Sequence, residues 1–160
     1  DDENAAFDGT KILIDQGKTN LLGIFGNQEL QITKSRLKGF NKALAKSEIK
    51  SATKFISVKD KDMVQKLQLE IKNNKYDGIF TMSDEILLCA YTLVRQLDIY
   101  PSQVSLTAIS DGILPTQLFP PVKYVKHSGY EIGKTAASRL LEIKSKPSIT
   151  EHIQINTVIQ

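Results

Sequence analysis

Two predicted strands end in small polar and acidic residues that could hold a small molecule. Ser83 and Asp84 follow one apolar run, and Ser110 and Asp111 follow another. In an open parallel sheet, ligands bind in the crevice outside the carboxyl ends of the strands. The pattern therefore predicts a pocket for a small polar molecule, and it favours a sensor over a catalyst.

Three further sites add polar groups near the same predicted edge. Arg36 lies early in a predicted helix, and its fork of donors could hold paired sugar hydroxyls, a carboxylate or a purine edge. Asn27 and residues 59–61 follow predicted strands and could also line the pocket. The alternatives are a solvated helix arginine and ordinary solvated loop residues.

The strand-end residues have structural interpretations as well. Ser83 could cap a helix whose first turn holds Asp84, and Asp111 could cap the loop ahead of Ile113. No clear aromatic platform for stacking a ligand is expected, because Phe55 lies within a strand and is predicted to be core. Both interpretations of the polar residues stay open at this point.

The sequence predicts no catalytic, metal-binding or cofactor-binding constellation. His127 and His152 are separated by a whole predicted helix, and the sequence has neither a glycine-rich phosphate loop nor a nucleophile-elbow pattern. Cys89 lies in an apolar helical run, which predicts a buried and unreactive thiol in a reducing compartment. We therefore expect a binding protein rather than an enzyme, without a metal or a cofactor.

Composition limits the remaining classes. The chain has 160 residues, of which 41% are hydrophobic and 24% charged, and its formal net charge is +3. These values fit one globular unit. Arginine is rare, and basic residues are not concentrated on any one helix that could read DNA. Direct DNA binding by this chain is therefore not expected. The sequence has no apolar segment of roughly 20 residues, and its first residues are acidic. These two features predict a cytoplasmic protein without membrane contact.

Helical and strand patterns alternate along the chain. Helices are expected at residues 3–17, 30–46, 62–74, 84–97 and 128–143, and strands at 21–26, 53–58, 79–82, 104–109 and 123–125. A last edge strand is expected around Ile153, Ile155 and Val158. Strands separated by helices of this length predict an α/β fold with a doubly wound parallel sheet.

Four segments in order resemble the LacI/GalR family of bacterial transcriptional regulators. Residues 35–44 read SRLKGFNKAL and are similar to the family's R-x-x-G-[FWY]-x-x-A-L helix. Residues 80–85 resemble its apolar strand ending in a polar residue and Asp, and residues 104–122 its strand, loop and proline element. Residues 133–141 are similar to its G-x-x-A-x-x-x-L-L helix. The combination covers nearly the whole chain.

The resemblance implies a type I periplasmic-binding-protein-like region without the family's DNA-binding headpiece. It implies a nearly complete C-terminal lobe at about residues 21–121 and 151–160, and parts of the N-terminal lobe at about residues 1–20 and 122–150. The implied ligand residues are Arg36, Ser83, Ser110, Asp111 and Asn27. The implied effector is a small sugar, a sugar derivative or a purine-like nucleobase.

One departure from the family pattern concerns ligand identity. The family strand ends in G-[FY]-D-[DN], whereas this chain has Ala108, Ile109, Ser110 and Asp111. A carboxylate accepts two strong hydrogen bonds where a hydroxyl offers weaker, rotatable ones. The departure implies a different preferred ligand or weaker binding.

The helix after Ser83 is apolar around more than half of its circumference, and the following loop adds more apolar residues. Such excess predicts contact with another subunit, although complete burial within one chain is the alternative. The resemblance places a two-fold dimer contact at Leu88, Leu114 and Leu118, with Phe119 beside them.

The sequence as a whole predicts the ligand-sensing and dimerising region of a LacI-type regulator, which would reach DNA only through a headpiece absent from this chain. The alternative is a periplasmic sugar-binding protein of an ABC transporter, which shares the two-lobed fold. Which effector binds, and whether it induces or represses, is not predicted.

Overall fold

A computed structural model describes residues 1–45, 47–145 and 153–160. Helices and strands alternate along most of the chain, as the sequence pattern predicts. The elements are α1 (Asp2–Asp15), β1 (Asn20–Phe25), α2 (Gln31–Leu44), β2 (Lys50–Phe55), α3 (Lys61–Asn74), β3 (Gly78–Thr81), α4 (Asp84–Gln96), β4 (Ser105–Ser110), α5 (Leu114–Gln117), β5 (Lys123–Lys126), α6 (Gly129–Ser145) and β6 (Val158–Ile159).

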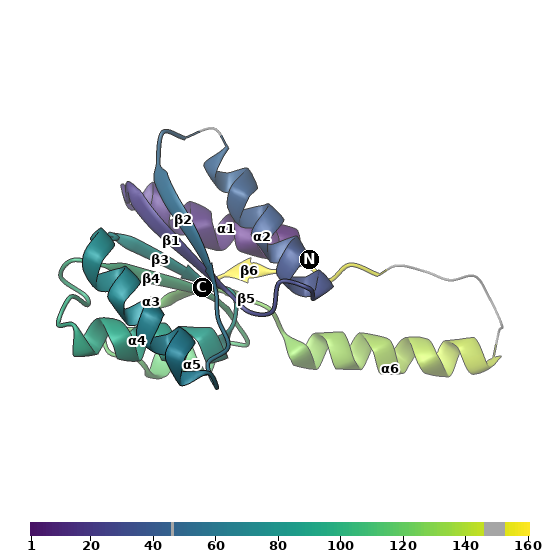
Figure 1. Ribbon diagram of the computed structural model, residues 1–160. Helices are drawn as coiled ribbons and strands as arrows, with labels where there is room; N and C mark the ends of the chain where they lie inside the picture. The colour runs from purple at the N-terminus through teal and green to yellow at the C-terminus, as the bar shows by residue number, and fades with distance from the viewer. Residues whose placement is uncertain (46, 146–152) are drawn as a thin grey trace.

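The strands form one six-stranded sheet in the order β2-β1-β3-β4-β5-β6 (Figure 1). Strands β1 to β5 pair in parallel, and β6 joins β5 antiparallel at the edge. The chain moves outward from β1 in both directions, so β1 lies at the point where the strand order reverses. This confirms the predicted doubly wound α/β fold, and it directs attention to the carboxyl end of β1.

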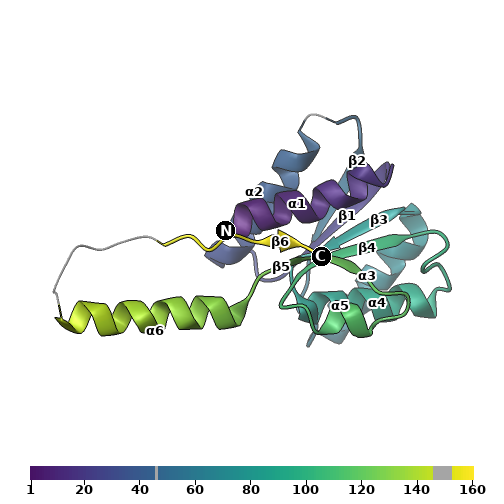
Figure 2. The same ribbon diagram turned by 180° about the vertical axis from the view of Figure 1, so that it is seen from behind.

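Helices cover both faces of the sheet: α1 and α2 lie on one face, and α3 and α4 on the other (Figures 1 and 2). Phe25, Phe40 and Phe80 are fully buried between the sheet and α2, and their ring centroids are 5.7–5.8 Å apart. Buried polar side chains of this core bond to backbone groups. Thr107 donates to the carbonyl of Gly9, which joins β4 to α1 at 3.0 Å.

Gly39 lets α1 and α2 approach closely. A Cβ atom at this position would lie 2.0 Å from the carbonyl oxygen of Glu3, so only glycine fits. Ala5, Ala6 and Leu13 of α1 are fully buried in the same core. Residues 2–15 therefore pack in one core with the elements that follow them, and the expected division into lobes stays a prediction.

Helix α4 begins as its sequence predicts. The Ser83 hydroxyl accepts a hydrogen bond from the backbone N–H of Ile86, and Asp84 and Glu85 in the first turn face the positive end of the helix dipole. Ile86, Leu87 and Val94 are buried against the sheet. This start fixes the position of Ser83 at the carboxyl end of β3.

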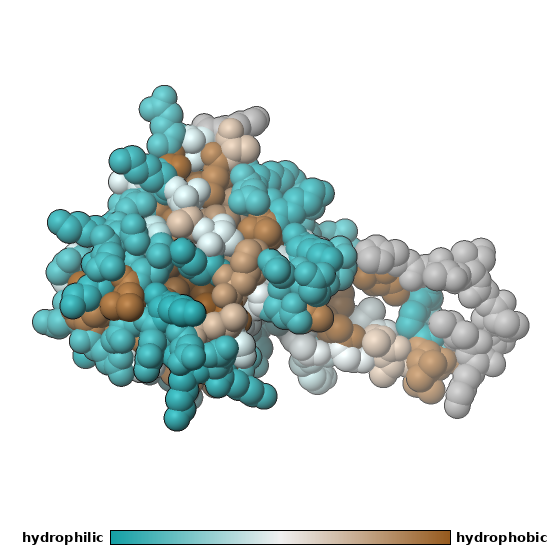
Figure 3. All heavy atoms as spheres, in the orientation of Figure 1, coloured by the Kyte–Doolittle hydropathy of each residue, from teal (hydrophilic) through white to brown (hydrophobic). Residues whose placement is uncertain are grey.

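Helix α6 extends away from the rest of the molecule (Figures 1 and 2). Its apolar side chains Tyr130, Ile132, Leu140 and Leu141 are exposed, and apolar residues are visible on the protruding arm in Figure 3. The boundaries expected at residues 150 and 151, like His152, lie outside the described residues. In the part of the chain that is described, no helix is long and apolar enough to cross a membrane.

Strand boundaries differ from the sequence expectation at the sheet edges. Strand β2 ends at Phe55 rather than near Val58, and the last strand comprises only Val158 and Ile159. Both are edge strands with exposed or half-buried residues, so burial imposes little apolar alternation on them. The short helix α5 lies where a loop was expected.

Candidate functional site

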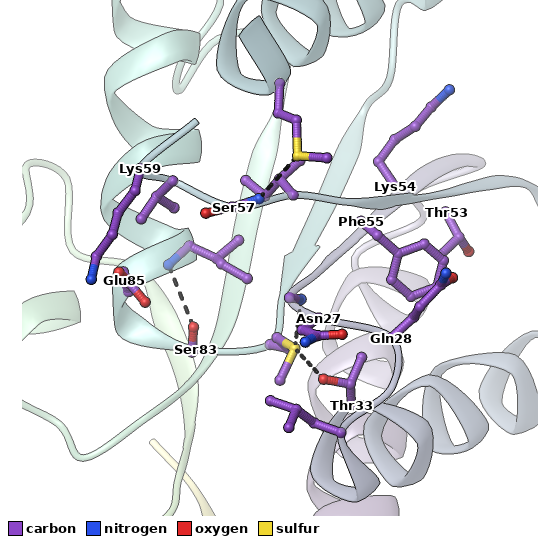
Figure 4. A pocket seen from close by; sticks show the side chains of 17 residues that line it. Asn27, Gln28, Thr33, Thr53, Lys54, Phe55, Ser57, Lys59, Ser83 and Glu85 are labelled. Atoms are coloured by element: carbon purple, nitrogen blue, oxygen red, sulfur yellow. Dashed lines mark hydrogen bonds between the residues drawn. The ribbon is translucent and has the colours of Figure 1, made fainter. Parts of the chain in front are cut away.

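The principal candidate site is a pocket of about 940 Å³ at the carboxyl ends of three neighbouring strands (Figure 4). It opens where β1, β2 and β3 end, which is the point at which the strand order reverses. The lining residues come from the three strand ends and from the helices that follow. They are Gly26, Asn27, Gln28, Leu30, Thr33, residues 53–59, Met63, Met82, Ser83, Glu85 and Ile86.

Two of the predicted ligand residues, Asn27 and Ser83, line this pocket together. The Asn27 side-chain oxygen accepts a hydrogen bond from the backbone N–H of Glu29 at 2.9 Å, which leaves its NH₂ group as a donor. The Ser83 oxygen accepts from Ile86 at 3.4 Å and keeps a rotatable O–H. Both side chains are held by local backbone bonds at the pocket wall.

Arg36 is placed differently from the sequence expectation. It is only 5% exposed and is not among the residues that line the pocket. Its Nε and Nη2 atoms lie 2.8 and 2.7 Å from Oδ1 of Asp2, and its Nη1 donates to the carbonyl of Met82. The guanidinium therefore connects the start of α1 to Met82, which follows β3 and lines the pocket.

His127 completes this partly buried polar group. Its Nε2 lies 3.7 Å from the Asp2 carboxylate, and its backbone N–H donates to the carbonyl of Ser110 at 2.8 Å. Burial lowers the pKa of His127, as does the nearby charge of Arg36, whereas Asp2 raises it. The net shift is downward, which favours the neutral imidazole.

Ser110 and Asp111 stabilise their own loop. The Ser110 hydroxyl accepts from the backbone N–H of Gly112 at 2.9 Å, and the Asp111 carboxylate accepts from that of Ile113 at 3.1 Å. The backbone N–H of Asp111 donates to the Asp84 carboxylate at 3.3 Å. Ser110 is buried and lies outside the lining of the principal pocket.

Asp111 instead lines a second hollow, of about 590 Å³, between the loop after β4 and the start of α6. Lys126, Ser128 and Glu131 also line this hollow. The structure thus separates the five predicted ligand residues. Asn27 and Ser83 share one pocket, Asp111 lines another, and Arg36 and Ser110 line neither.

The sequence interpretation missed most of the residues that line the principal pocket, among them both methionines and Phe55. Met63 and Met82 are the only two methionines of the chain, and both line the pocket. Phe55 was expected to be core, but it is half-buried and lines the pocket because β2 is an edge strand. Their positions at a strand end or in the first turn of a helix after a strand could have suggested this location.

The predicted dimer residues vary in exposure. Phe119 is 80% exposed and Leu88 50%, whereas Leu114 is half-buried and Leu118 is buried. Leu88 lies on α4, and Phe119 lies shortly after α5. Only Leu88 and Phe119 of the four present a large apolar surface to solvent.

Other reactive groups form no second site in the described part of the chain. Among the residues described, no group of three or more His, Cys, Asp or Glu side chains could hold a metal ion. Cys89 is half-buried, and this burial raises the pKa of its thiol. A raised pKa leaves less reactive thiolate at neutral pH.

The sequence matches a known family over most of its length. Residues 10–160 match the periplasmic binding protein-like domain. The ribose operon repressor of Haemophilus influenzae is 29% identical over 154 residues, and a transcriptional repressor named PurR from Aliivibrio salmonicida is 28% identical over 153 residues. The matches cover 91% and 90% of this chain but only 46% and 45% of the two repressors, so the chain spans about half their length.

The fold matches solved structures over the whole chain. A LacI family transcriptional regulator from Enterococcus faecalis, solved with bound ribose, superposes with a TM-score of 0.88 at 20% identity. The match covers 100% of this chain and 59% of that structure. At this identity the likeness shows a shared fold.

Proposed function

Since the chain belongs to the periplasmic binding protein-like domain family and resembles LacI-type repressors along nearly its whole length, we propose that it is the effector-binding region of such a regulator. The observation that carries this proposal is the pocket at the carboxyl ends of β1, β2 and β3. Open parallel sheets bind ligands at such a reversal of strand order.

The proposed effector is a small sugar, a sugar derivative or a nucleobase. The pocket offers amide and hydroxyl groups from Asn27, Gln28 and Ser83, and an apolar surface from Leu30, Phe55 and Ile86. A few oriented polar groups on a largely apolar wall are typical of small-molecule sites. The ribose-bound regulator of the same fold supports this class of ligand.

We propose that the pocket is one wall of a cleft between two lobes. Strands β1 to β6 form one sheet and share a core with the helices packed on it, whereas α6 extends away with exposed apolar side chains. Those side chains would pack into a second lobe, supplied by the part of the regulator that this chain does not span. The proposed boundary therefore lies near residue 127 rather than at residues 20 and 121.

The effector would act by favouring one arrangement of the two lobes. A ligand that contacts both walls stabilises the closed arrangement, and a DNA-binding headpiece joined to the other lobe would respond to it. A coupling free energy of about 1–3 kcal/mol between ligand and DNA is typical of such linkage. The transporter alternative has less support, because the relatives that match most of the chain are repressors.

Calorimetry and thermal unfolding of the complete regulator test the proposal. A panel of pentoses, hexoses and purine bases should contain a ligand that binds saturably. At a ligand concentration 100 times the dissociation constant, the ligand should stabilise the protein by about 2.7 kcal/mol. If no member of the panel bound or raised the melting temperature, the proposal would be wrong.

A further inference from the structure

The two methionines of the chain form part of the same pocket wall. Met82 follows β3 and Met63 lies in the first turn of α3. Each sulfur accepts a backbone hydrogen bond from the end of a neighbouring strand. The N–H of Gly26 lies 3.0 Å from the Met82 sulfur, and the N–H of Ser57 lies 3.4 Å from the Met63 sulfur (Figure 4).

These bonds hold two polarisable thioethers at the pocket surface. Met82 is almost completely buried, while Met63 is 42% exposed. Phe55 and Leu30 lie on the same pocket, and Leu30 is 52% exposed. Thioether sulfur makes favourable contacts with aromatic rings. On this wall the two sulfurs lie together with an aromatic and an aliphatic side chain. Such a wall suits a flat, apolar ring face.

The charged groups near the pocket are poorly placed to hold sugar hydroxyls. The guanidinium of Arg36 is bound to Asp2 and to the Met82 carbonyl. Lys54 lines the pocket, but its ammonium group is paired with Glu70 at 3.0 Å. Glu85 is the single carboxylate among the lining residues. In Figure 4 it lies with Lys59 on the opposite side of the pocket from Phe55 and Gln28.

The polar groups on the Phe55 side include two amides, beside Thr53 and Lys54. Asn27 and Gln28 line the pocket there, and the Asn27 NH₂ group remains a donor because its oxygen is bound to Glu29. An amide side chain presents a donor and an acceptor side by side, which matches the edge of a nitrogen heterocycle such as adenine. The arrangement combines a wall for a ring face with groups for a ring edge.

We infer that the effector of this pocket carries a planar nitrogen heterocycle of the nucleobase type, which packs against Met63, Met82 and Phe55 and directs its edge to Asn27 and Gln28. This inference rests on the proposed function and narrows its ligand class. A free monosaccharide would leave the thioether wall without a matching surface.

Methyl NMR of the chain tests the inference directly. Methionine labelled with ¹³C at the methyl group gives one resonance from Met63 and one from Met82, which the variants Met63→Leu and Met82→Leu assign. Adenine and D-ribose are the probes, each added at millimolar concentration. Adenine should move both methyl resonances upfield in a saturable manner, because nuclei above a ring face are shielded, and D-ribose should leave both in place.

A matched pair of variants tests the contact energetically. Met63→Ala should weaken adenine binding by about 2- to 10-fold, the range expected for loss of a sulfur–aromatic contact. Leu69→Ala removes an exposed apolar side chain from the same helix, outside the pocket, and should leave the affinity unchanged. Equal affinities of the two variants would overturn the inference.

The remaining outcomes separate the inference from the proposed function. If D-ribose bound saturably and adenine did not, the ligand class would be wrong while the effector-binding function stood. If neither probe moved any resonance and the panel of sugars and bases also failed to bind the complete regulator, the proposed function would fall together with the inference.

Discussion

The guanidinium of Arg36 and the carboxylate of Asp2 form a two-point contact in which Nε and Nη2 lie 2.8 and 2.7 Å from the same oxygen. Arg36 is buried, and Asp2 is partly exposed at the start of α1. The pair joins the first turn of α1 to α2. The Met82 carbonyl, which accepts from the same guanidinium, extends the connection to the pocket.

Removal of the Asp2 carboxylate should destabilise the fold. Asp2→Ala leaves a buried guanidinium with one fewer partner, and hydrogen bonds to charged groups contribute roughly 1.5–3 kcal/mol. We expect the free energy of unfolding in urea to fall by about 2 kcal/mol. Glu3→Ala is the matched control, because the lysine partners of Glu3 are exposed, and it should have a much smaller effect. Equal losses would contradict a special role for Asp2.

Gly39→Ala should be among the most damaging small substitutions. The added Cβ would lie 2.0 Å from the Glu3 carbonyl oxygen, so α1 and α2 would have to separate. We expect a loss of about 3 kcal/mol, at the upper end for overpacking. Gly133→Ala is the control, since nothing lies within 4 Å of a Cβ there. Urea unfolding of both variants measures the difference, and a stable Gly39→Ala protein would show that the helix contact is looser.

The contacts of Arg36 and Gly39 illustrate how much the sequence can reveal. The R-x-x-G-F pattern identified Arg36 and Gly39 as important, and the alternation of elements predicted the doubly wound sheet. The sequence pattern could not reveal that the Arg36 guanidinium is bound to Asp2, 34 residues away. Periodicity reports which face of an element is buried, whereas the pairing of distant polar groups depends on how the elements pack.

The candidate site shows the same limit. Asn27 and Ser83 were predicted because polar residues after parallel strands meet at one edge, and they do share a pocket. Met63, Met82 and Phe55 were missed because apolar residues at strand ends cannot be told from core residues by pattern alone. Ser110 was expected at the pocket, but its hydroxyl is bound within the loop after β4. Whether any of these residues contacts a ligand stays a prediction.

The pKa of His127 should report the integrity of the Asp2 contact. Burial lowers this pKa below its ordinary value, and Asp2 partly opposes the shift. In Asp2→Asn the opposing charge is lost, so the His127 pKa should fall further. NMR titration of the imidazole signals measures both values, with His152 as the internal comparison. A higher pKa in Asp2→Asn would contradict the arrangement.

The same shift predicts a dependence of stability on pH. A histidine whose folded pKa is depressed binds its proton more readily in the unfolded chain. The contribution of neutral His127 to the free energy of unfolding is therefore fully present above a pH of about 6.5, the ordinary histidine pKa. It is lost as the pH falls toward the pKa of the folded state. In His127→Gln this part of the loss should disappear. Unfolding free energies at several pH values between 7.5 and 5 check it, and an unchanged pH profile would exclude His127 as the source.

Leu88 and Phe119 should be the side chains that hold two copies of the chain together. We propose this because they are the exposed members of the predicted dimer surface, on α4 and after α5. Their substitution by lysine should shift the sedimentation-equilibrium mass from two chains to one. The melting temperature of the dissociated chain should be retained, because neither side chain is buried within it. Leu118→Lys, by contrast, should unfold the chain, since Leu118 is buried.

A matched surface leucine makes the dimer experiment specific. Leu30 is 52% exposed against 50% for Leu88, but it directly precedes α2, which lies on the other face of the sheet from α4. Leu30→Lys should therefore leave the mass at two chains. If Leu88→Lys and Phe119→Lys also left it there, the contact would have to lie elsewhere, and the exposed apolar side chains of α6 would be the next to substitute. A chain that is monomeric before any substitution would refute the proposed dimer surface for this region.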